Sequence, residues 1–293
     1  MEEKIMYGFF EECYNCRLKK YVYSVDLPEK EKEAYVKRQL EKVKQAPLDM
    51  KAKDFQAMLM EEYNKVFVPK DFSQIKHYYN KKIMDLSADF EEKANKSDDP
   101  MLYTLKLALI GNYIDFDAFI DVDDDKLLDM LNNADRKDID MEAYQKLNND
   151  LSKAKSLVYF TDNCGEVVLD KLFIKQIAKK YPNLSITAIV RGEEVLNDAS
   201  LIDAKEIGLD EVCTVVDNGL SGTKTIFANM PKDRKEIVDN ADVMIAKGQA
   251  NAESLNGCGL NMYYIFLCKC EKFANEYNAK KFDAIISRDK KAK

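Results

Sequence analysis

Hydrophobic and polar positions follow two different patterns along the chain, and the change falls near residue 155. Over residues 1 to about 155, apolar residues recur every three or four positions with charges between them, which predicts amphipathic helices. The clearest such segments are residues 29–43, 52–66, 74–95 and 103–110, with Pro28, Pro47, Pro69 and Pro100 at the breaks. Because proline starts or stops helices, we predict a helical N-terminal region over residues 1–150.

From about residue 156, apolar residues gather into short continuous runs rich in β-branched and aromatic side chains. These runs are residues 156–161, 185–190, 212–216, 241–246 and 262–267, with helical patterns between them at 167–180, 199–207 and 232–238. Strands that alternate with helices form a mostly parallel sheet, and continuous apolar runs indicate strands buried on both faces. Residues 151–293 are therefore predicted to form an α/β domain.

Composition narrows the classes of partner. The 293 residues are 46% hydrophobic and 33% charged, with a formal net charge of -7. An acidic balance argues against nucleic acid as a partner, and no apolar stretch reaches the roughly 20 residues of a membrane span. The charged start, from Met1 to Lys4, does not resemble a secretion signal. We expect a cytoplasmic protein that binds neither nucleic acid nor membrane; its oligomeric state stays open.

Histidine and cysteine restrict the chemistry further. His77 is the only histidine, which excludes a serine–histidine–aspartate triad and two-histidine metal sites. Seven cysteines without a secretion signal indicate reduced thiols. Cys13 and Cys16 have the spacing of half a zinc site or of a redox pair, and Cys270 could supply a third thiolate. Plain thiols are the alternative.

Polar residues follow the first two predicted strands at their carboxyl ends, the edge where open α/β sheets bind ligands. Asp162 and Asn163 come after the first strand, and Gly165 then permits a tight turn into a helix. The amino terminus of a helix attracts anions such as phosphate. Arg191 and, further on, Asp198 follow the second strand. The acids and the amide could instead cap the next helix.

The third and fourth strands end in turns that contain glycine. Gly222 and Thr223 lie in a loop whose N–H groups could surround an anion, although an ordinary flexible loop has the same composition. Lys247 directly follows the fourth strand, a position that favours a cation aimed at the ligand. Carboxylate and amide oxygens suit Mg²⁺ or Mn²⁺, and a metal beside a phosphate cradle indicates phosphoryl transfer.

The motifs of the chain resemble those of the damage-control phosphatase family, also called domain of unknown function 89. The matching segments are Asp162-Asn163-Cys164-Gly165-Glu166, Asn197-Asp198, Lys247-Gly248-Gln249-Ala250-Asn251-Ala252-Glu253 and Gly111-Asn112-Tyr113-Ile114-Asp115. Cys13, Cys16 and Lys269-Cys270 are similar to the prokaryotic, CxxC-containing branch. The resemblance covers nearly the whole chain. Ala252 stands where the family often has tyrosine, which bears on substrate preference and not on the chemistry.

This resemblance implies a Rossmann-like three-layer α/β/α domain with the N-terminal helical region packed on it. It implies that Asp162, Asn163 and Asp198 hold a divalent metal (Mn²⁺, Mg²⁺, Co²⁺ or Ni²⁺) as the catalytic residues. It also implies that Lys247 contacts the phosphate of a sugar phosphate or of a damaged phosphometabolite. Other motif positions would bind substrate in less definite roles: Asn112, Glu166, Arg191 and Glu253.

The predicted reaction is hydrolysis of a phosphate monoester by a metal-activated water, with loop N–H groups around Gly222 and Thr223 on the phosphate. Asp162 or a neighbouring carboxylate would orient that water. Two alternatives stay open. One is an S-adenosylmethionine-dependent carboxyl methyltransferase, although the first loop has a single glycine and the second strand ends in Arg191 instead of an acid. The other is a protein that binds a phosphorylated metabolite without turnover.

Overall fold

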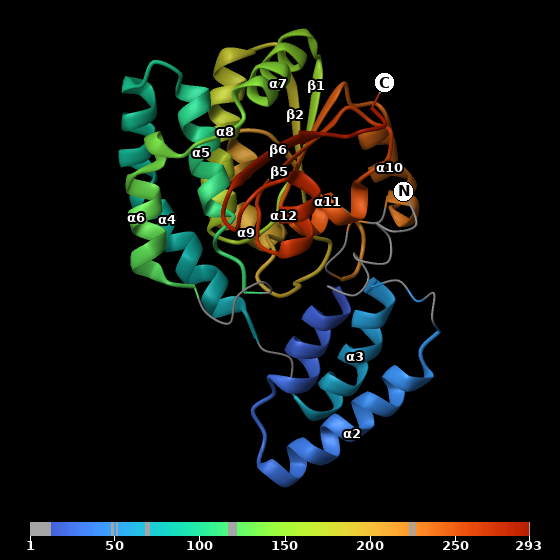
Figure 1. The fold of residues 1–293 in the computed structure, drawn as a ribbon. Coiled ribbons are helices and arrows are strands. Elements are labelled where there is room, and N and C mark those ends of the chain that lie inside the picture. Colours follow the sequence, from blue (N-terminus) through green and yellow to red (C-terminus); the bar gives the residue numbers. More distant parts are fainter. Residues whose placement is uncertain are drawn as a thin grey trace. The chain divides into compact units, whose positions relative to one another are not determined.

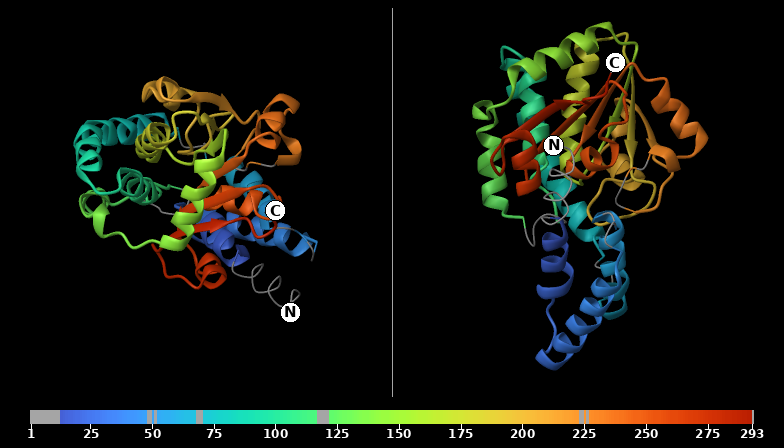
Figure 2. Two further views of the ribbon diagram at one scale, coloured as in Figure 1. Left: turned by 90° about the horizontal axis from the view of Figure 1, so that it is seen from above. Right: turned by 45° about the vertical axis from the view of Figure 1, so that its right-hand side comes forward.

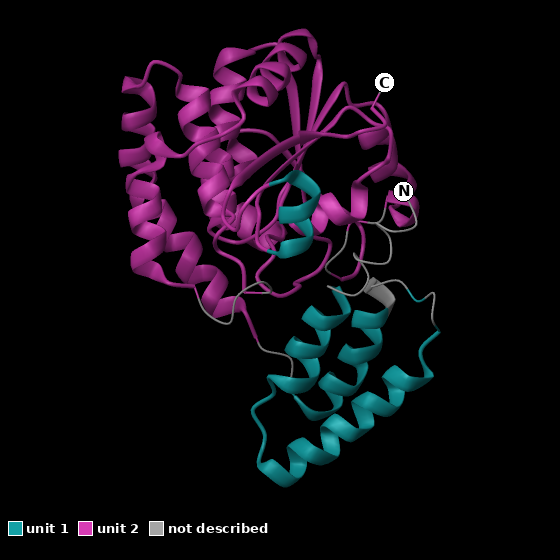
Figure 3. Cartoon of the chain, viewed as in Figure 1, with its two compact units in different colours: residues 1–70, 270–278 teal, residues 71–269, 279–293 magenta. Residues whose placement is uncertain are grey.

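The computed structural model describes residues 13–47, 50, 52–67, 71–116, 122–222, 225 and 227–292. The chain divides into two compact units, coloured separately in Figure 3. Unit 1 comprises residues 1–70 and 270–278, and unit 2 comprises residues 71–269 and 279–293. The division therefore falls near residue 70, and not at the predicted boundary between residues 150 and 151.

Unit 1 is helical (Figure 1). Its elements are a helical segment at residues 13–18, the π-helix η1 (Lys19–Tyr23), α2 (Glu29–Gln45), α3 (Ala52–Val66) and α12 (Glu271–Tyr277). Tyr21, Val22, Phe55 and Leu59 form a small buried core. The amide of Gln39, on α2, donates to the carbonyl of Leu59 at 3.0 Å and so ties α2 to α3. Two helices predicted from the periodic pattern are thus present.

Unit 2 contains a six-stranded sheet in the order β3-β2-β1-β4-β5-β6 (Figure 1). Five strands are parallel: β1 (Ser156–Phe160), β2 (Ser185–Val190), β3 (Thr214–Asp217), β4 (Val243–Lys247) and β5 (Met262–Leu267). The sixth strand, β6 (Ala284–Arg288), runs antiparallel to β5 at one edge. The mostly parallel sheet predicted from the alternating pattern is confirmed.

Helices cover both faces of this sheet, as the two views in Figure 2 show. On one side lie α4 (Ser73–Lys96), α5 (Pro100–Gly111) and α8 (Glu166–Lys180); on the other lie α10 (Lys232–Asp239) and α11 (Gln249–Leu255). The remaining helical elements of unit 2 are α6 (Asp124–Asn132), η2 (Ala134–Arg136), α7 (Met141–Lys153), α9 (Leu201–Glu206), η3 (Leu209–Glu211) and η4 (Phe227–Asn229). This three-layer arrangement confirms the predicted Rossmann-like fold class.

The helices α4 and α5 belong with the sheet because they share its core. A helix that is apolar on most of its sides must be buried on most of them. Helix α5 is such a helix, since Lys106 is its one charged residue and Leu105, Leu107 and Leu109 are fully buried. These side chains form one cluster with Ile83 of α4 and Phe173 of α8. No helix in the described part of the chain is both long and apolar enough to span a membrane.

Register brings the ends of three strands to one level. Phe160, at the end of β1, is paired with Ile189 in β2 and with Ala246 in β4. Because parallel strands present their carboxyl ends at the same edge, the loops after β1, β2 and β4 emerge side by side. β1 lies between β2 and β4, where the strand order reverses, and open α/β sheets bind their ligands at such a point.

Candidate active site at the carboxyl edge of the sheet

The loop between β1 and α8 carries Asp162 and Asn163. α8 begins at Glu166, but neither side chain caps it, because the residue before the helix is Gly165 and the cap lacks a side-chain hydrogen bond. Gly165 has a φ of +69°, and a Cβ there would lie 2.8 Å from Cδ1 of Ile114, so glycine is the residue that this turn accommodates. The alternative interpretation of Asp162 and Asn163 as helix caps is therefore wrong.

The carboxylate of Asp162 is buried and held on one side. Its Oδ2 accepts hydrogen bonds from Nδ2 of Asn112 at 3.0 Å and from Nδ2 of Asn163 at 2.8 Å. Gly248, directly after β4, has a φ of +80°, and a Cβ there would lie 1.9 Å from Oδ2 of Asp162. Asp162 can therefore occupy this position only because residue 248 has no side chain. Its Oδ1 accepts no hydrogen bond within the described residues.

Lys247 lies in a fully buried cluster next to Asp162. Its Nζ is 2.8 Å from Oε1 of Glu166, 2.6 Å from Oδ1 of Asp170 and 3.0 Å from the carbonyl oxygen of Ala108. Burial alone would lower the pKa of Lys247, but the carboxylates of Asp170 and Glu166 outweigh burial and raise it. Burial also raises the pKa of Asp170 to about 6, against the opposing effect of Lys247.

This arrangement gives Lys247 a structural role. An ammonium group has three N–H donors, and here each one has a protein acceptor. Glu166 in turn accepts from Nδ2 of Asn112 at 2.9 Å and from Nδ2 of Asn163 at 2.9 Å, the same two amides that hold Asp162. Lys247 therefore supports Asp162 through Glu166. Its predicted contact with phosphate stays a prediction, for which this geometry offers no spare donor.

The loop after β2 is hydrogen-bonded to the loop after β1. Asn163 and Asp198 form an isolated antiparallel bridge, and the backbone N–H of Ala199 donates to the carbonyl of Asp162 at 2.7 Å. The cap of α9 is Ser200, in a capping box, so Asp198 does not serve as that cap. The two predicted metal-binding acids, both buried, therefore come from joined loops.

Arg191 lies between these two acids. The residue is 3% exposed. Its Nε donates to Oδ2 of Asp198 at 2.6 Å, and its Nη1 donates to Oγ1 of Thr225 at 2.8 Å. Its Nη2 lies 3.9 Å from Oδ1 of Asp162. One guanidinium group is thus close to both acids that the sequence predicts as metal ligands.

Negative charge exceeds positive charge around Asp162. The neighbouring ionisable groups are five carboxylates and three cations: Asp115, Asp162, Glu166, Asp170, Asp198, Arg191, Lys247 and Lys269. Burial, reinforced by the charges of Glu166 and Asp198, raises the pKa of Asp162 well above its usual range. When all five carboxylates are ionised they outnumber the three cations by two, and a bound cation would compensate that charge.

The oxygen atoms available at this edge of the sheet are of the types that a hard divalent cation prefers as ligands. Asp162 and Asp198 offer carboxylate oxygens, and Asn163 offers an amide oxygen that accepts one hydrogen bond, from Nδ2 of Asn197 at 3.0 Å, and keeps a second lone pair. Among the described residues, no three histidine, cysteine, aspartate or glutamate side chains form a group that could hold a metal. A cation here would therefore need the amide oxygen and oxygens of the substrate as further ligands.

Helix α4 connects to the loop after β1 and to helix α9, which follows the loop after β2, through residues that the sequence did not predict. Oδ1 of Asn80 accepts from the backbone N–H of Gly165 at 2.7 Å, and Nδ2 of Asn80 donates to Oδ1 of Asp203 at 2.9 Å. One turn earlier, Nζ of Lys76 lies 2.7 Å from Oδ2 of Asp203. Both α4 residues are buried. Polar residues on the apolar face of a predicted amphipathic helix were the available signal.

The other predicted substrate-binding residues are placed as follows. Asn112 and Glu166 lie in the cluster around Asp162. Gly222 is exposed with a φ of +89°, and Glu253 is exposed on α11. Thr223 lies outside the described residues. Two buried neighbours of Arg191 were not predicted as site residues, and they are Thr225 and Asn251.

All seven cysteines lie in the described residues, and none of them forms a disulfide. Cys13 and Cys270 are partly exposed, and Cys16 is exposed. Within the described ranges, these three are not grouped as a set of metal ligands. A structural metal or a redox pair at these cysteines stays a prediction, beside the alternative of plain thiols.

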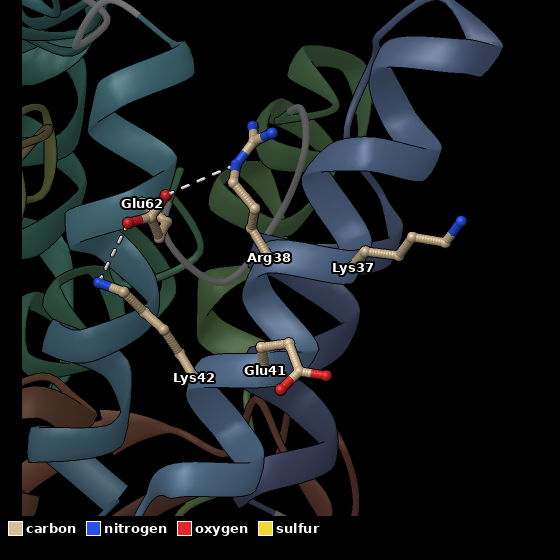
Figure 4. Close-up of a pocket in the computed structure, with 5 residues that line it drawn as sticks. All are labelled: Lys37, Arg38, Glu41, Lys42 and Glu62. Atoms are coloured by element: carbon tan, nitrogen blue, oxygen red, sulfur yellow. Dashed lines mark ion pairs between the residues drawn. The ribbon is translucent and has the colours of Figure 1, made fainter.

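A hollow of about 390 Å³ on unit 1 is a different kind of surface (Figure 4). Its lining is charged, and the ion pairs of Glu62 with Lys42 at 3.2 Å and with Arg38 at 3.8 Å satisfy part of that charge. Glu41 and Lys37 complete the lining. Lys37 points away from the hollow in Figure 4. We assign no ligand to it, because exposed lysines and glutamates on adjacent helices are what a solvated helical surface presents.

The geometry of this edge agrees with the family that the motifs suggest. The family model of the damage-control phosphatase ARMT1-like domain matches residues 9–285. The chain belongs to the damage-control phosphatase family. The resemblance predicted from the motifs is therefore confirmed, while membership of the CxxC-containing branch stays a prediction.

The chain is similar in sequence to proteins of three organisms. An uncharacterised protein of Methanocaldococcus jannaschii is 30% identical over 256 residues, which is 78% of this chain and 83% of that protein. A damage-control phosphatase of Archaeoglobus fulgidus is 27% identical over 73% of this chain and 74% of its own length. A damage-control phosphatase of Pyrococcus horikoshii is 27% identical over 64% of each chain.

The fold is similar to that of a solved structure. A crystal structure of a DUF89 family protein from Pyrococcus horikoshii superposes with a TM-score of 0.74 and 22% sequence identity. The match covers 95% of this chain and 98% of that one. It supports the fold described above.

Proposed function

We propose that this chain is a metal-dependent phosphatase that hydrolyses phosphate monoesters of small metabolites, with sugar phosphates and damaged phosphometabolites as the expected substrates. Family membership supports the phosphatase activity. One observation carries the proposed site: Asp162, Asn163 and Asp198 come from two loops that are hydrogen-bonded to each other and bury an excess of negative charge.

In this proposal Asp162, Asn163 and Asp198 hold the cation, which would be Mn²⁺, Mg²⁺, Co²⁺ or Ni²⁺. A divalent cation supplies charge neutralisation at the phosphoryl oxygens and lowers the pKa of a bound water. The contribution of the chain is to fix the ligands. Asn112 and Glu166 immobilise Asp162 and Asn163, and the bridge between the loops sets the position of Asp198.

Proton transfer falls to carboxylates. His77, the single histidine, is exposed on α4 and pairs with Glu206. Asp162 is the carboxylate that we assign to the attacking water, because Asn112 and Asn163 hold its Oδ2 and so fix the orientation of the group. Its Oδ1, which lacks a hydrogen-bond donor within the described residues, is the atom available for this task.

The decisive experiment is a screen of phosphate esters with several divalent metals and with a chelator. We expect hydrolysis of one or more sugar phosphates or generic esters with added metal, and its loss with chelator. A parallel methyl-transfer assay tests the alternative of a methyltransferase. Metal-independent methyl transfer, or tight binding of phosphorylated metabolites with no hydrolysis under any metal, would contradict the proposal.

A substitution at Asp162 tests the assignment of the site. Asp162→Asn keeps the shape of the side chain but removes its charge, and we expect loss of Mn²⁺ binding in calorimetry together with loss of turnover. Asp85→Asn is the matched control, since Asp85 is an exposed carboxylate that pairs with Lys81 on α4. An Asp162→Asn variant that retains full metal-dependent turnover would rule out this site.

A further inference from the structure

A buried nitrogen of Arg191 lacks the acceptor that such a group requires. Within the described residues, Nη2 of Arg191 has no hydrogen-bond partner, although the side chain is 3% exposed. The carboxylate oxygen Oδ1 of Asp162, at 3.9 Å, lies beyond hydrogen-bond distance. Buried polar groups in native proteins are nearly always hydrogen-bonded. An unpaired buried N–H therefore indicates an acceptor other than the described residues.

The guanidinium group is held in one orientation. Asp198 fixes Nε and Thr225 fixes Nη1, and because the group is planar and rigid, these two contacts also determine where Nη2 lies. Thr225 is itself anchored, since its hydroxyl donates to Oδ1 of Asn251 at 2.9 Å. Nδ2 of Asn251 donates to the carbonyl of Thr161, the residue after β1, at 3.0 Å and to the carbonyl of Lys247, the last residue of β4, at 2.8 Å. Nη2 is therefore directed toward Asp162 by a chain of hydrogen bonds that starts on the sheet.

We propose that Arg191 is the residue that binds the phosphoryl oxygens of the substrate, through Nη2. This inference rests on the proposed function and names the residue of that site that donates a hydrogen bond to the phosphate. A guanidinium N–H next to the predicted metal ligands suits an oxyanion, because arginine binds phosphate through charge-assisted hydrogen bonds. Lys247, the donor expected from the family resemblance, has its three N–H groups engaged by Glu166, Asp170 and Ala108.

The neighbouring acids make this binding conditional on the cation. Asp162 and Asp198 flank the guanidinium group, and their negative charge repels a free anion. Phosphate should therefore bind weakly to metal-free protein and more tightly once Mn²⁺ compensates that charge. This dependence on Mn²⁺ distinguishes nonspecific binding of phosphate from binding at a site where Arg191 and the metal contact the same anion.

The test uses inorganic phosphate as the probe, with calorimetry on Mn²⁺-saturated protein and inhibition of ester hydrolysis as a second readout. Arg191→Lys keeps a positive charge beside Asp198. The ammonium group of lysine cannot contact Asp198, Thr225 and the phosphate at the same time. We expect Arg191→Lys to keep Mn²⁺ binding and to weaken phosphate binding about 10- to 100-fold, the usual effect of losing a charge-assisted hydrogen bond. KM for the ester should rise in parallel.

Two further variants keep the test decisive. Thr225→Val removes the hydroxyl that orients Nη1 and should weaken phosphate binding about 3- to 10-fold, even if substitution of Arg191 prevents folding. Arg234→Lys is the matched control, because Arg234 also binds a carboxylate, that of Asp217 at 3.3 Å, but lies outside the cluster. It should leave phosphate binding unchanged.

The outcomes distinguish this inference from the proposed function. Phosphate affinity of Mn²⁺-saturated Arg191→Lys within about twofold of wild type would overturn the inference, and so would a loss confined to Mn²⁺ binding. If the wild type hydrolyses esters but Arg191→Lys and Thr225→Val bind phosphate normally, the function stands and the inference fails. If no ester is hydrolysed, yet phosphate binding depends on Arg191, the anion site stands without the proposed reaction.

Discussion

Two buried cations at the same edge of the sheet differ in how completely the protein uses them. Lys247 is the last residue of β4 and Arg191 directly follows β2, and each pairs with acids. Every N–H of Lys247 has an acceptor inside the protein. Arg191 keeps one nitrogen, Nη2, without a partner in the described part of the chain.

This difference distinguishes a cation that stabilises the fold from a cation that can bind a ligand. A charge whose hydrogen bonds are all internal stabilises the fold and cannot take a ligand without first giving up a bond. A charge held in place with one donor left over can accept a ligand at little cost in reorganisation. The position of a cation after a buried strand therefore does not distinguish the two roles, whereas its remaining hydrogen-bonding capacity does.

The largest effect that would test this comparison is expected at Lys247. Lys247→Met leaves the carboxylates of Glu166 and Asp170 buried without their cation, which costs about 3–5 kcal/mol of unfolding free energy. Denaturant unfolding measures this loss. A variant that unfolds at the wild-type midpoint but has a raised KM would instead place Lys247 on the substrate and break the comparison.

The next effect is expected at the glycine next to Lys247. In Gly248→Ala the new methyl group would overlap Oδ2 of Asp162, which a Cβ would approach to 1.9 Å. Because displacement of a reacting group by about 1 Å can cost about 100-fold in rate, we expect at least that loss in kcat/KM, with weaker Mn²⁺ binding.

Gly257→Ala is the matched control for that substitution. Gly257 has the same φ of +80°, but the atoms nearest to its Cβ would be those of the Lys291 side chain, at 3.6 Å or more. It should carry the same backbone strain and keep its activity. Equal losses of activity in both variants would show that strain, and not the position of Asp162, is responsible.

A smaller effect is expected at Asn80, which joins the loop after β1 to helix α9. Asn80→Ala removes the acceptor of the Gly165 N–H and a donor to Asp203. Substitution of residues that hold metal ligands in position typically lowers metal affinity or activity 10- to 100-fold. For Asn80→Ala we expect the lower end of that range, a loss of about 10-fold in Mn²⁺ affinity. Asn95→Ala, on the exposed part of α4, is the control. Unchanged Mn²⁺ affinity in Asn80→Ala would remove the link from α4 to the site.

The sequence predicts the parallel strands well, and also the edge of the sheet at which the candidate site lies, because both depend on local pattern. Buried strands have continuous apolar runs, and parallel order places their carboxyl ends together. The motif residues Asp162, Asn163 and Asp198 could therefore be assigned to one edge before any coordinates. The antiparallel strand β6 was not predicted, since its continuous apolar run comprises only Ala284, Ile285 and Ile286.

The partners of the buried charges could not be predicted, because they come from distant parts of the chain. Lys247 meets Ala108, 139 residues away, and Asn80 meets Gly165, 85 residues away. The domain boundary was misplaced for a related reason. Amphipathic periodicity shows that α4 and α5 are helices, but it does not show that their apolar faces pack on the sheet of unit 2.

Helix α4 also fixes the spacing between two of the side chains that support the site. Lys76 and Asn80 are four residues apart and so stand about 6 Å apart along the axis on nearly the same face; both bind Asp203, and Asn80 also binds Gly165. Inserting a single residue between them would turn one contact away from the other by about 100°. Residues 76–80 should therefore tolerate conservative replacement at their solvent-facing positions, but no change in length.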